Sequence, residues 1–313
     1  MDFMRLGFKL LSATAARGRL SILIFHRVLP QPDEIFPDEV HARRFDEICT
    51  WLKAWFQVLP LDQAGQLLAE GRLPTRACCI TFDDGYADNA QIALPILQKH
   101  GLPATFFIAT GFLQGGRMWN DTVIESVRHC RQAELDFGEH GCFHLSDAAS
   151  RRAAIEAIIG KIKYLPLDQR LAATQDLLAR SGAVLNEQLM MGPDGVRHLF
   201  EAGMQIGAHT VSHPILAKTA PDSAREEILS SKRYLEDLLG QECTLFAYPN
   251  GKPGRDYAPE HVAMVRELGF KTAVSTAWGA SGPGADPLQL QRFTPWDASK
   301  SAFGLRLMRN LIA

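Results

Sequence analysis

Two adjacent carboxylates end an apolar run that begins at Cys78 and closes in Asp83 and Asp84. In an α/β protein such a run predicts a buried parallel strand whose last side chains emerge at its C-terminal end, where ligands and catalysis gather. Asp84 could instead cap the helix predicted over residues 86–100. The pair alone therefore leaves a helix cap and a catalytic or metal-binding site as open alternatives.

A second pair of side chains, His209 and His213, follows the strand predicted over residues 204–208. Two histidines four residues apart can converge on one ion when the turn between them is helical. With one carboxylate from the other strand end they supply two nitrogens and one oxygen and leave coordination positions open. That is the ligand set of a catalytic Zn²⁺ or a non-haem Fe(II) site. The second aspartate would then be free to act as a base.

The elements that must position these residues are strands and helices in alternation. Short apolar runs predict strands at residues 20–28, 57–60, 78–82, 104–109, 204–208, 243–248, 270–275 and 288–293. Helical spacing between most of these runs indicates parallel βα units. From about 114 to 193 the rhythm changes to mainly helical segments, which predicts a helical insertion between two strands of a barrel.

Composition limits the class of protein. The 313 residues are 46% hydrophobic and 22% charged, which suits a globular protein with a sizeable core. A formal net charge of −2 with mixed signs gives no electrostatic reason to expect a nucleic-acid partner. Six cysteines are scattered without a CxxC pair, so we expect them to be reduced and structural, as in a reducing compartment.

Both ends of the chain, residues 1–19 and 298–313, are amphipathic and basic. Such segments either pack on the flank of a domain or lie on a membrane surface, and both alternatives stay open. The first segment is too short in its apolar part, and too interrupted by charge, to predict a signal peptide. No apolar run is long enough to predict a spanning helix. We therefore expect a protein that is cytoplasmic or peripheral to the membrane, and the sequence gives no indication of its oligomeric state.

Three motifs carry a family resemblance: TFDDGY at 81–86, HTVSH at 209–213 and FAYPNG at 246–251. In this order they resemble the motifs of the polysaccharide deacetylases that contain the NodB homology domain, carbohydrate esterase family 4. The resemblance covers residues 20–112 and 193–297 and leaves the helical insertion outside. It implies an α/β fold, a distorted, TIM-like (β/α) barrel, spanning 20–297 apart from the insertion. It also implies a metal-dependent hydrolase that removes N-acetyl groups from amino sugars of a polysaccharide or glycan precursor.

The resemblance also assigns roles to residues of this chain. It implies that Asp84, His209 and His213 bind the metal, with Asp83 as general base on a metal-bound water. The backbone N–H of Tyr248 would stabilise the oxyanion. The implied cofactor is Zn²⁺, with Co²⁺, Ni²⁺ and Fe²⁺ as alternatives, and the implied partner is an N-acetylated glycan. The residues expected to contact this glycan are Tyr86, Pro249, Asn250, Trp278 and Trp296. The two tryptophans either stack on a sugar or pack in the core.

Two departures from the family pattern concern catalysis. Ala247 stands where the family often has an arginine that pairs with the base, so Asp83 lacks a charge that would lower its pKa. Arg292, on the last predicted strand, is the candidate substitute. The late histidine that protonates the leaving amine is absent from residues 288–297. His26, at the end of the first strand, is the candidate proton donor, and a structural histidine is the alternative.

Two other functions remain compatible with the sequence. The same two histidines and carboxylate could hold Fe(II) for oxygen chemistry. A non-catalytic glycan-binding module could also retain the fold, and the missing arginine and late histidine favour that interpretation.

Overall fold

The computed structural model describes residues 3–297 and 299–313. Residues 1, 2 and 298, which belong to the predicted terminal segments, lie outside the described residues. The central sheet has eight strands in the order β1-β3-β4-β7-β8-β9-β10, with β2 paired to β3. Its strands are β1 (Ser21–Phe25), β2 (Gln57–Val58), β3 (Ala77–Phe82), β4 (Thr105–Ile108), β7 (Gln205–Ala208), β8 (Leu245–Ala247), β9 (Thr272–Trp278) and β10 (Leu290–Arg292).

The sheet curls until its last strand meets its first. Every neighbouring pair of strands is parallel. Phe293 forms a parallel bridge with Leu23: its N–H donates to the Ile22 carbonyl at 2.7 Å, and its carbonyl accepts from Ile24 at 3.0 Å. Nearly closed parallel strands surrounded by helices confirm the predicted distorted (β/α) barrel. All the strand C-terminal ends therefore open on one face, as barrel geometry requires.

Strand β3 lies at the centre of this arrangement because its sequence, ACCITF, can be buried on both faces. All six of its residues are buried. Phe82 at its end stacks on Phe25 of β1 and Phe106 of β4, with ring centroids 5.2 Å and 4.8 Å apart. The two carboxylates that follow Phe82 are thus anchored to a fully buried, aromatic part of the core.

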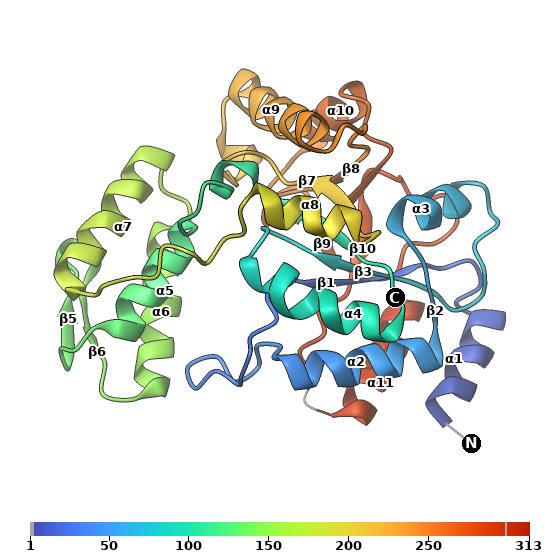
Figure 1. Cartoon of the computed structure of the whole chain (residues 1–313), viewed down its shortest axis with the longest axis horizontal. Helices are drawn as coiled ribbons and strands as arrows, with labels where there is room; N and C mark the ends of the chain where they lie inside the picture. Colours follow the sequence, from blue (N-terminus) through green and yellow to red (C-terminus); the bar gives the residue numbers. More distant parts are fainter. Residues whose placement is uncertain (1–2, 298) are drawn as a thin grey trace.

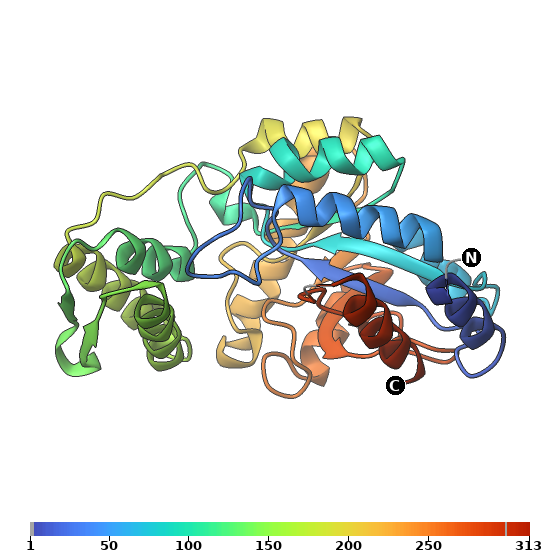
Figure 2. The ribbon, with the colours of Figure 1, turned by 90° about the horizontal axis from the view of Figure 1, so that it is seen from below.

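Helices cover the outside of the barrel (Figures 1 and 2). They are α1 (Phe3–Ala13), α2 (Ala42–Trp55), α3 (Leu61–Ala69), α4 (Leu94–His100), α8 (Pro193–Glu201), α9 (Pro221–Leu239), α10 (Pro259–Glu267) and α11 (Lys300–Ile312). The helix predicted from residue 86 instead includes a π-helical segment, Asn89–Ala93, whose N-cap position is Asp88. Asp84 therefore does not cap it, which removes the structural alternative for this carboxylate.

The insertion stands beside the barrel on the left of Figure 1. It contains helices α5 (Trp119–His129), α6 (Ala148–Ile162) and α7 (Leu167–Ser181) and the antiparallel hairpin of β5 (Glu134–Asp136) and β6 (Cys142–His144). These elements share a hydrophobic core of their own, which includes Val127, Ile158 and Leu177. Ile35 and Phe36 reach that core from the loop after β1. The sequence indicated few strands here because each hairpin strand has only three residues. The predicted domain boundaries stay predictions.

Helices α1 and α11, at opposite ends of the sequence, pack against each other (Figure 2). A Cβ atom on Gly7 would lie 2.6 Å from Met308, and one on Gly304 would lie 2.9 Å from Met4. Each helix thus places a methionine over the other's glycine, and close contact depends on the missing side chains. Among the helices of the described residues, none combines the length and hydrophobicity that crossing a bilayer requires.

Candidate active site

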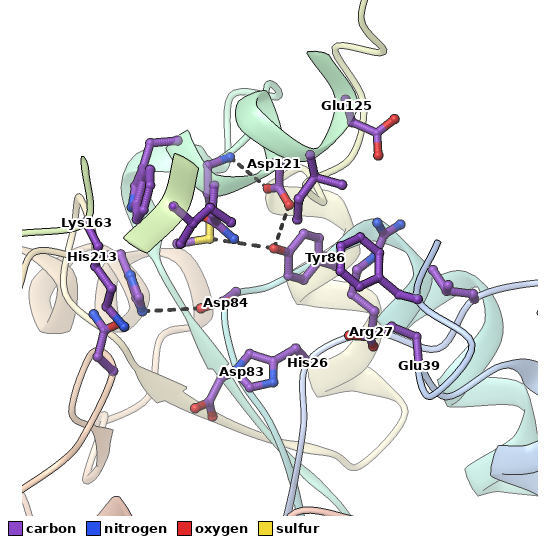
Figure 3. Close-up of a pocket in the computed structure, with 18 of the residues that line it drawn as sticks. His26, Arg27, Glu39, Asp83, Asp84, Tyr86, Asp121, Glu125, Lys163 and His213 are labelled. Carbon is purple, nitrogen blue, oxygen red and sulfur yellow. Dashed lines mark hydrogen bonds and ion pairs between the residues drawn. The ribbon is translucent and has the colours of Figure 1, made fainter. Parts of the chain in front are cut away.

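The predicted strand-end residues meet in one pocket of about 350 Å³ on the C-terminal face of the barrel (Figure 3). The barrel side is lined by His26, Asp83, Asp84, His209, His213 and Asn250, and the insertion side by residues that include Met118, Trp119, Asp121, Glu125 and Lys163. Its volume falls within the range of about 300–1,000 Å³ typical of small-molecule sites. The insertion therefore forms one wall of the pocket.

Asp84, His209 and His213 form a group of three potential metal ligands whose donor atoms all lie within 4.8 Å of one another. The Asp84 Oδ1 atom is 3.4 Å from His209 Nε2 and 3.5 Å from His213 Nε2. Ligands about 2.1 Å from a tetrahedral or octahedral ion lie about 3.0–3.4 Å apart, so little movement would be needed. Among the described residues neither Asp84 Oδ1 nor His213 Nδ1 has a hydrogen-bond partner, although both are buried. The residues fit a divalent cation.

The hydrogen bonds around the histidines orient their rings. His209 Nδ1 lies 2.7 Å from the Ala247 carbonyl, to which it donates, so Nε2 points toward Asp84. Burial lowers the pKa of His213 to about 3, which keeps this ring neutral, as a ligand must be. Burial also opposes protonation of His209, but Asp84 and Asp83 raise its pKa above the ordinary value. A bound cation would replace that proton.

Unusual backbone conformations concentrate in the loops that carry these residues. Asp84, Thr210, His213 and Asn250 have φ angles of 77°, 65°, 54° and 58°, in the left-handed region that non-glycine residues seldom adopt. The loop between the histidines is held by Glu227 of α9, which accepts hydrogen bonds from two backbone N–H groups and one hydroxyl. Strain of this kind persists where surrounding contacts fix the backbone, and it is typical of functional sites.

Asp83 is paired with the arginine that the sequence offered as a substitute. Arg292 donates two hydrogen bonds to it, Nη1 to Oδ1 and Nη2 to Oδ2, each 2.7 Å long. The Arg292 side chain is fully buried. Burial alone would raise the pKa of Asp83, but Arg292 and His209 more than offset it, and the pKa lies below its ordinary value. Arg292 thus supplies from β10 the positive charge that position 247 lacks.

His26 follows β1 and lines the pocket beside Asp83 (Figure 3). Its carbonyl accepts a hydrogen bond from Asn89, whereas no hydrogen bond of its ring is present among the described residues. The next residue, Arg27, is bound to Asp88 at 2.8 Å. The main chain is thus fixed on both sides of His26 while its imidazole is exposed to the pocket. This placement suits a proton donor, although the role itself stays a prediction.

Only some of the residues predicted to contact a glycan line a pocket. Tyr86 and Asn250 line the pocket, but the Tyr86 hydroxyl is used in a 3.0 Å hydrogen bond to Asp121 of the insertion. Trp296 is 62% exposed and lines an adjoining pocket of about 420 Å³ that also contains His26. Trp278 is 47% exposed and Pro249 is buried, and neither lines these two pockets. The core-packing alternative for the tryptophans is excluded by their exposure.

Tyr248 does not provide the free donor that the resemblance implied. Its backbone N–H donates to the Val274 carbonyl at 3.2 Å, because the strand ladder continues one residue beyond β8. Its ring is fully buried and stacks on Tyr257 with a centroid distance of 3.8 Å. The expected oxyanion contact from this N–H is therefore corrected: in this structure the group is already occupied.

The sequence profile described as "Polysaccharide deacetylase" matches residues 70–164 and 170–273, more than half of the chain. The chain belongs to the polysaccharide deacetylase family. The profile extends through most of the insertion, so the expectation that the likeness stops near residue 112 was wrong. The helices of the insertion belong to the family pattern although they carry none of its three motifs.

Relatives of this deacetylase agree with that assignment. YxkH of Bacillus subtilis (strain 168), whose name places it among the polysaccharide deacetylases, is 24% identical over 295 residues, 93% of this chain and 77% of that protein. The deacetylase PplD of Streptococcus pyogenes, solved with acetate, has a TM-score of 0.61 at 19% identity, covering 94% of this chain and 98% of that one. IcaB from Ammonifex degensii has a TM-score of 0.61 at 18% identity, covering 94% and 97%. The two structures share the fold.

Three residues of this deacetylase's site were missed by sequence reasoning. Glu227 lies on α9 and holds the loop between the histidines, and Asp121 and Lys163 lie in the insertion. Asp121 is buried between the Tyr86 hydroxyl and the Met118 N–H, and burial raises its pKa to about 6. No motif marks any of them. Only the position of the insertion beside the barrel brings Asp121 and Lys163 to the pocket.

Proposed function

We propose that this deacetylase hydrolyses N-acetyl groups of amino sugars in a polysaccharide or glycan precursor with a divalent cation held by Asp84, His209 and His213. The observation that carries the proposal is the convergence of these three ligands beside the Asp83–Arg292 pair in one pocket. A divalent ion bound there would supply a Lewis acid that polarises the amide carbonyl and makes water more acidic. Zn²⁺ is the cofactor we propose, and Co²⁺, Ni²⁺ and Fe²⁺ suit the same ligands.

Asp83 takes the proton of the attacking water. Its lowered pKa keeps the carboxylate ionised at neutral pH, and the two hydrogen bonds from Arg292 hold it in one orientation. The side-chain amide of Asn250, which lines the same pocket, is the available donor for the substrate carbonyl in place of the Tyr248 N–H. His26, which lines the pocket beside Asp83, delivers a proton to the departing amine.

The first expected result is acetate release from an N-acetylglucosamine oligomer or polymer. Purified protein should release acetate, and a chelator should stop the release because Asp84 and the histidines then lack their ion. Added Zn²⁺ or Co²⁺ should restore it. Acetate measured enzymatically, with metal content determined in parallel, checks this. Release that a chelator leaves untouched, in protein shown to be free of metal, would rule out the metal role; an absence of release from every N-acetylated glycan would rule out the hydrolase.

Two alternatives are separated by the same assay. An Fe(II) enzyme would need oxygen, so acetate release under anaerobic conditions without a 2-oxo acid excludes it. A non-catalytic glycan-binding module was favoured by the missing arginine at position 247. The Arg292–Asp83 pair removes that argument, because the base has its cation from another strand.

The paired terminal helices are proposed to rest on an anionic membrane. Phe3, Leu6 and Leu10 follow one another on one face of α1 and are 82%, 41% and 59% exposed. On α11, Leu305 and Ile312 are 57% and 51% exposed. Neither helix contains an acidic residue within its bounds, and both contain lysine and arginine. Exposed apolar side chains on helices that contain basic and no acidic residues match a lipid surface with anionic headgroups, although Arg306 of α11 is paired with Asp297.

Vesicle binding tests this surface. The protein should sediment with vesicles that contain phosphatidylglycerol, more weakly in high salt, and little with pure phosphatidylcholine. Replacing Phe3 and Leu10 by serine should abolish binding. Val184→Ser is the matched control, since Val184 is an apolar residue 93% exposed outside these helices. Equal sedimentation of both variants would contradict the assignment.

A further inference from the structure

Three basic side chains cluster around one edge of the active-site pocket, near the buried carboxylate of Asp256. Lys163, the residue after α6, lines the pocket together with His213 and lies on the same side of it in Figure 3. Lys252 and Arg255 lie in the loop that follows β8. No ion pair of these three side chains is present within residues 3–297 and 299–313. We call Lys163, Lys252 and Arg255 the cationic rim.

The rim is assembled from both parts of the molecule. The ring of Tyr164 lies between its members: the Lys163 ammonium is 5.7 Å and the Arg255 guanidinium 5.0 Å from its centroid. Tyr164 belongs to the insertion, and Arg255 to the barrel. The rim therefore lies where the insertion meets the barrel. Lys163 lines the pocket, and Lys252 and Arg255 are exposed beside it.

The main chain at Lys163 is fixed by a contact within the insertion. The buried Arg170 donates a 3.3 Å hydrogen bond to the Lys163 carbonyl. The Arg170 guanidinium in turn lies 4.9 Å from the ring of Trp119, which lines the pocket. Burial lowers the pKa of Lys163, and the neighbouring Arg255, Arg170 and Lys252 lower it further, opposed by Asp256. These cations repel one another, and an anion among them would relieve the repulsion.

Other arginines around the same pocket are neutralised. Arg27 is bound to Asp88 at 2.8 Å, and Arg128 is bound to Asp33 at 2.8 Å and to Glu125 at 3.2 Å. At the rim the nearby carboxylate, Asp256, is buried and accepts a hydrogen bond from the backbone N–H of Lys252. Three cations near one buried carboxylate leave this edge with an excess of positive charge, whereas the arginines named above are paired.

We propose that the cationic rim binds a phosphate or carboxylate group of the substrate, on the sugar that carries the acetamido group or on its neighbour. The inference rests on the proposed function, since it names the substrate class of the same site: an anionic N-acetylated glycan or glycan precursor. Lysine and arginine at the edge of a pocket attract such a group and orient it through charge-assisted hydrogen bonds. A neutral glycan would leave these charges unused.

The test compares matched substrates with the metal-loaded protein. The neutral substrates are N-acetylglucosamine and its oligomer; the anionic ones are N-acetylglucosamine 1-phosphate, the 6-phosphate and N-acetylmuramic acid. We expect a lower KM for at least one anionic sugar than for N-acetylglucosamine. Comparing the phosphate sugars with N-acetylmuramic acid shows whether the rim binds a phosphate or a carboxylate. Lys163→Met should raise that KM about tenfold and raise the KM for neutral sugars much less. Lys271→Met is the control, because Lys271 is exposed and lies before β9, at the opposite end of the barrel.

Each outcome decides one of the two proposals. If the neutral and anionic sugars have equal KM, or Lys163→Met raises both alike, the rim is not an anion site although acetate release still supports the hydrolase. If no substrate releases acetate, the proposed function fails, and calorimetric titration with N-acetylglucosamine 1-phosphate and N-acetylglucosamine tests the rim alone. Preferential binding of the phosphate that Lys163→Met abolishes supports the rim; equal binding overturns it.

Discussion

Replacing Asp84 by alanine is expected to abolish both metal retention and acetate release. The Asp84 carboxylate lies 3.4 Å and 3.5 Å from the two histidine nitrogens, and it is the only carboxylate of the three-ligand group. Without it two neutral nitrogens remain, and the favourable charge of the carboxylate on the cation is lost. His209→Ala and His213→Ala should have the same effect. Metal content after desalting and a Co²⁺ titration measure the loss independently of turnover.

The backbone at Asp84 calls for a second variant. With a φ angle of 77°, alanine at this position would be strained, and poor folding could mimic metal loss. Asparagine tolerates this conformation and keeps the size of the side chain, so Asp84→Asn separates the two effects. Asp194→Ala is the control, because Asp194 is an exposed carboxylate on α8. A folded Asp84→Asn protein that holds one metal ion per chain as tightly as the original would contradict the ligand assignment.

Asp83→Asn is expected to keep the metal and lose acetate release by a factor of about 10²–10⁴. An amide fills the same space beside Arg292, but it cannot accept the proton of water. Equal metal content with lost turnover distinguishes the base from the ligands. Full activity of Asp83→Asn would exclude Asp83 as the base.

The pH dependence of kcat/KM tests the same assignment through Arg292. Arg292 and His209 hold the pKa of Asp83 below its ordinary value against the effect of burial. In Arg292→Lys the bidentate hydrogen bond to Asp83 is lost. The effect of burial is then less well offset, so the pKa of Asp83 rises. Asp83 then stays protonated to higher pH, and the acidic limb of the kcat/KM profile shifts to higher pH. Arg292→Met would leave a buried carboxylate unpaired at a cost of about 3–5 kcal/mol, so lysine is the better variant.

His26 is tested by substitution. If it is the proton donor, His26→Gln should keep the metal content and lower kcat, because glutamine cannot deliver a proton to the departing amine. An unchanged kcat in His26→Gln would return His26 to a structural role.

The sequence predicted the candidate catalytic and metal-binding residues better than the residues that form the walls of the pocket. Asp83, Asp84 and the two histidines could be predicted because each directly follows an apolar strand, and parallel strands end on one face. Arg292 could be found because the last strand of a closed barrel returns to the first. That the Tyr248 N–H is already hydrogen-bonded could not be predicted, because this depends on where the hydrogen-bond ladder between β8 and β9 ends. Lys163 escaped detection because the packing of the insertion on the barrel leaves no periodic signal.

The insertion keeps a hydrophobic core separate from that of the barrel, and this separation has an evolutionary consequence. Substitutions in its helices can be compensated within that core, without disturbing the strands that carry Asp83 and Asp84. Yet the same helices form one wall of the pocket. Natural selection can therefore alter which glycan is accepted and leave the hydrolytic apparatus intact, so diversification of substrate choice across relatives should be sought first between residues 119 and 181.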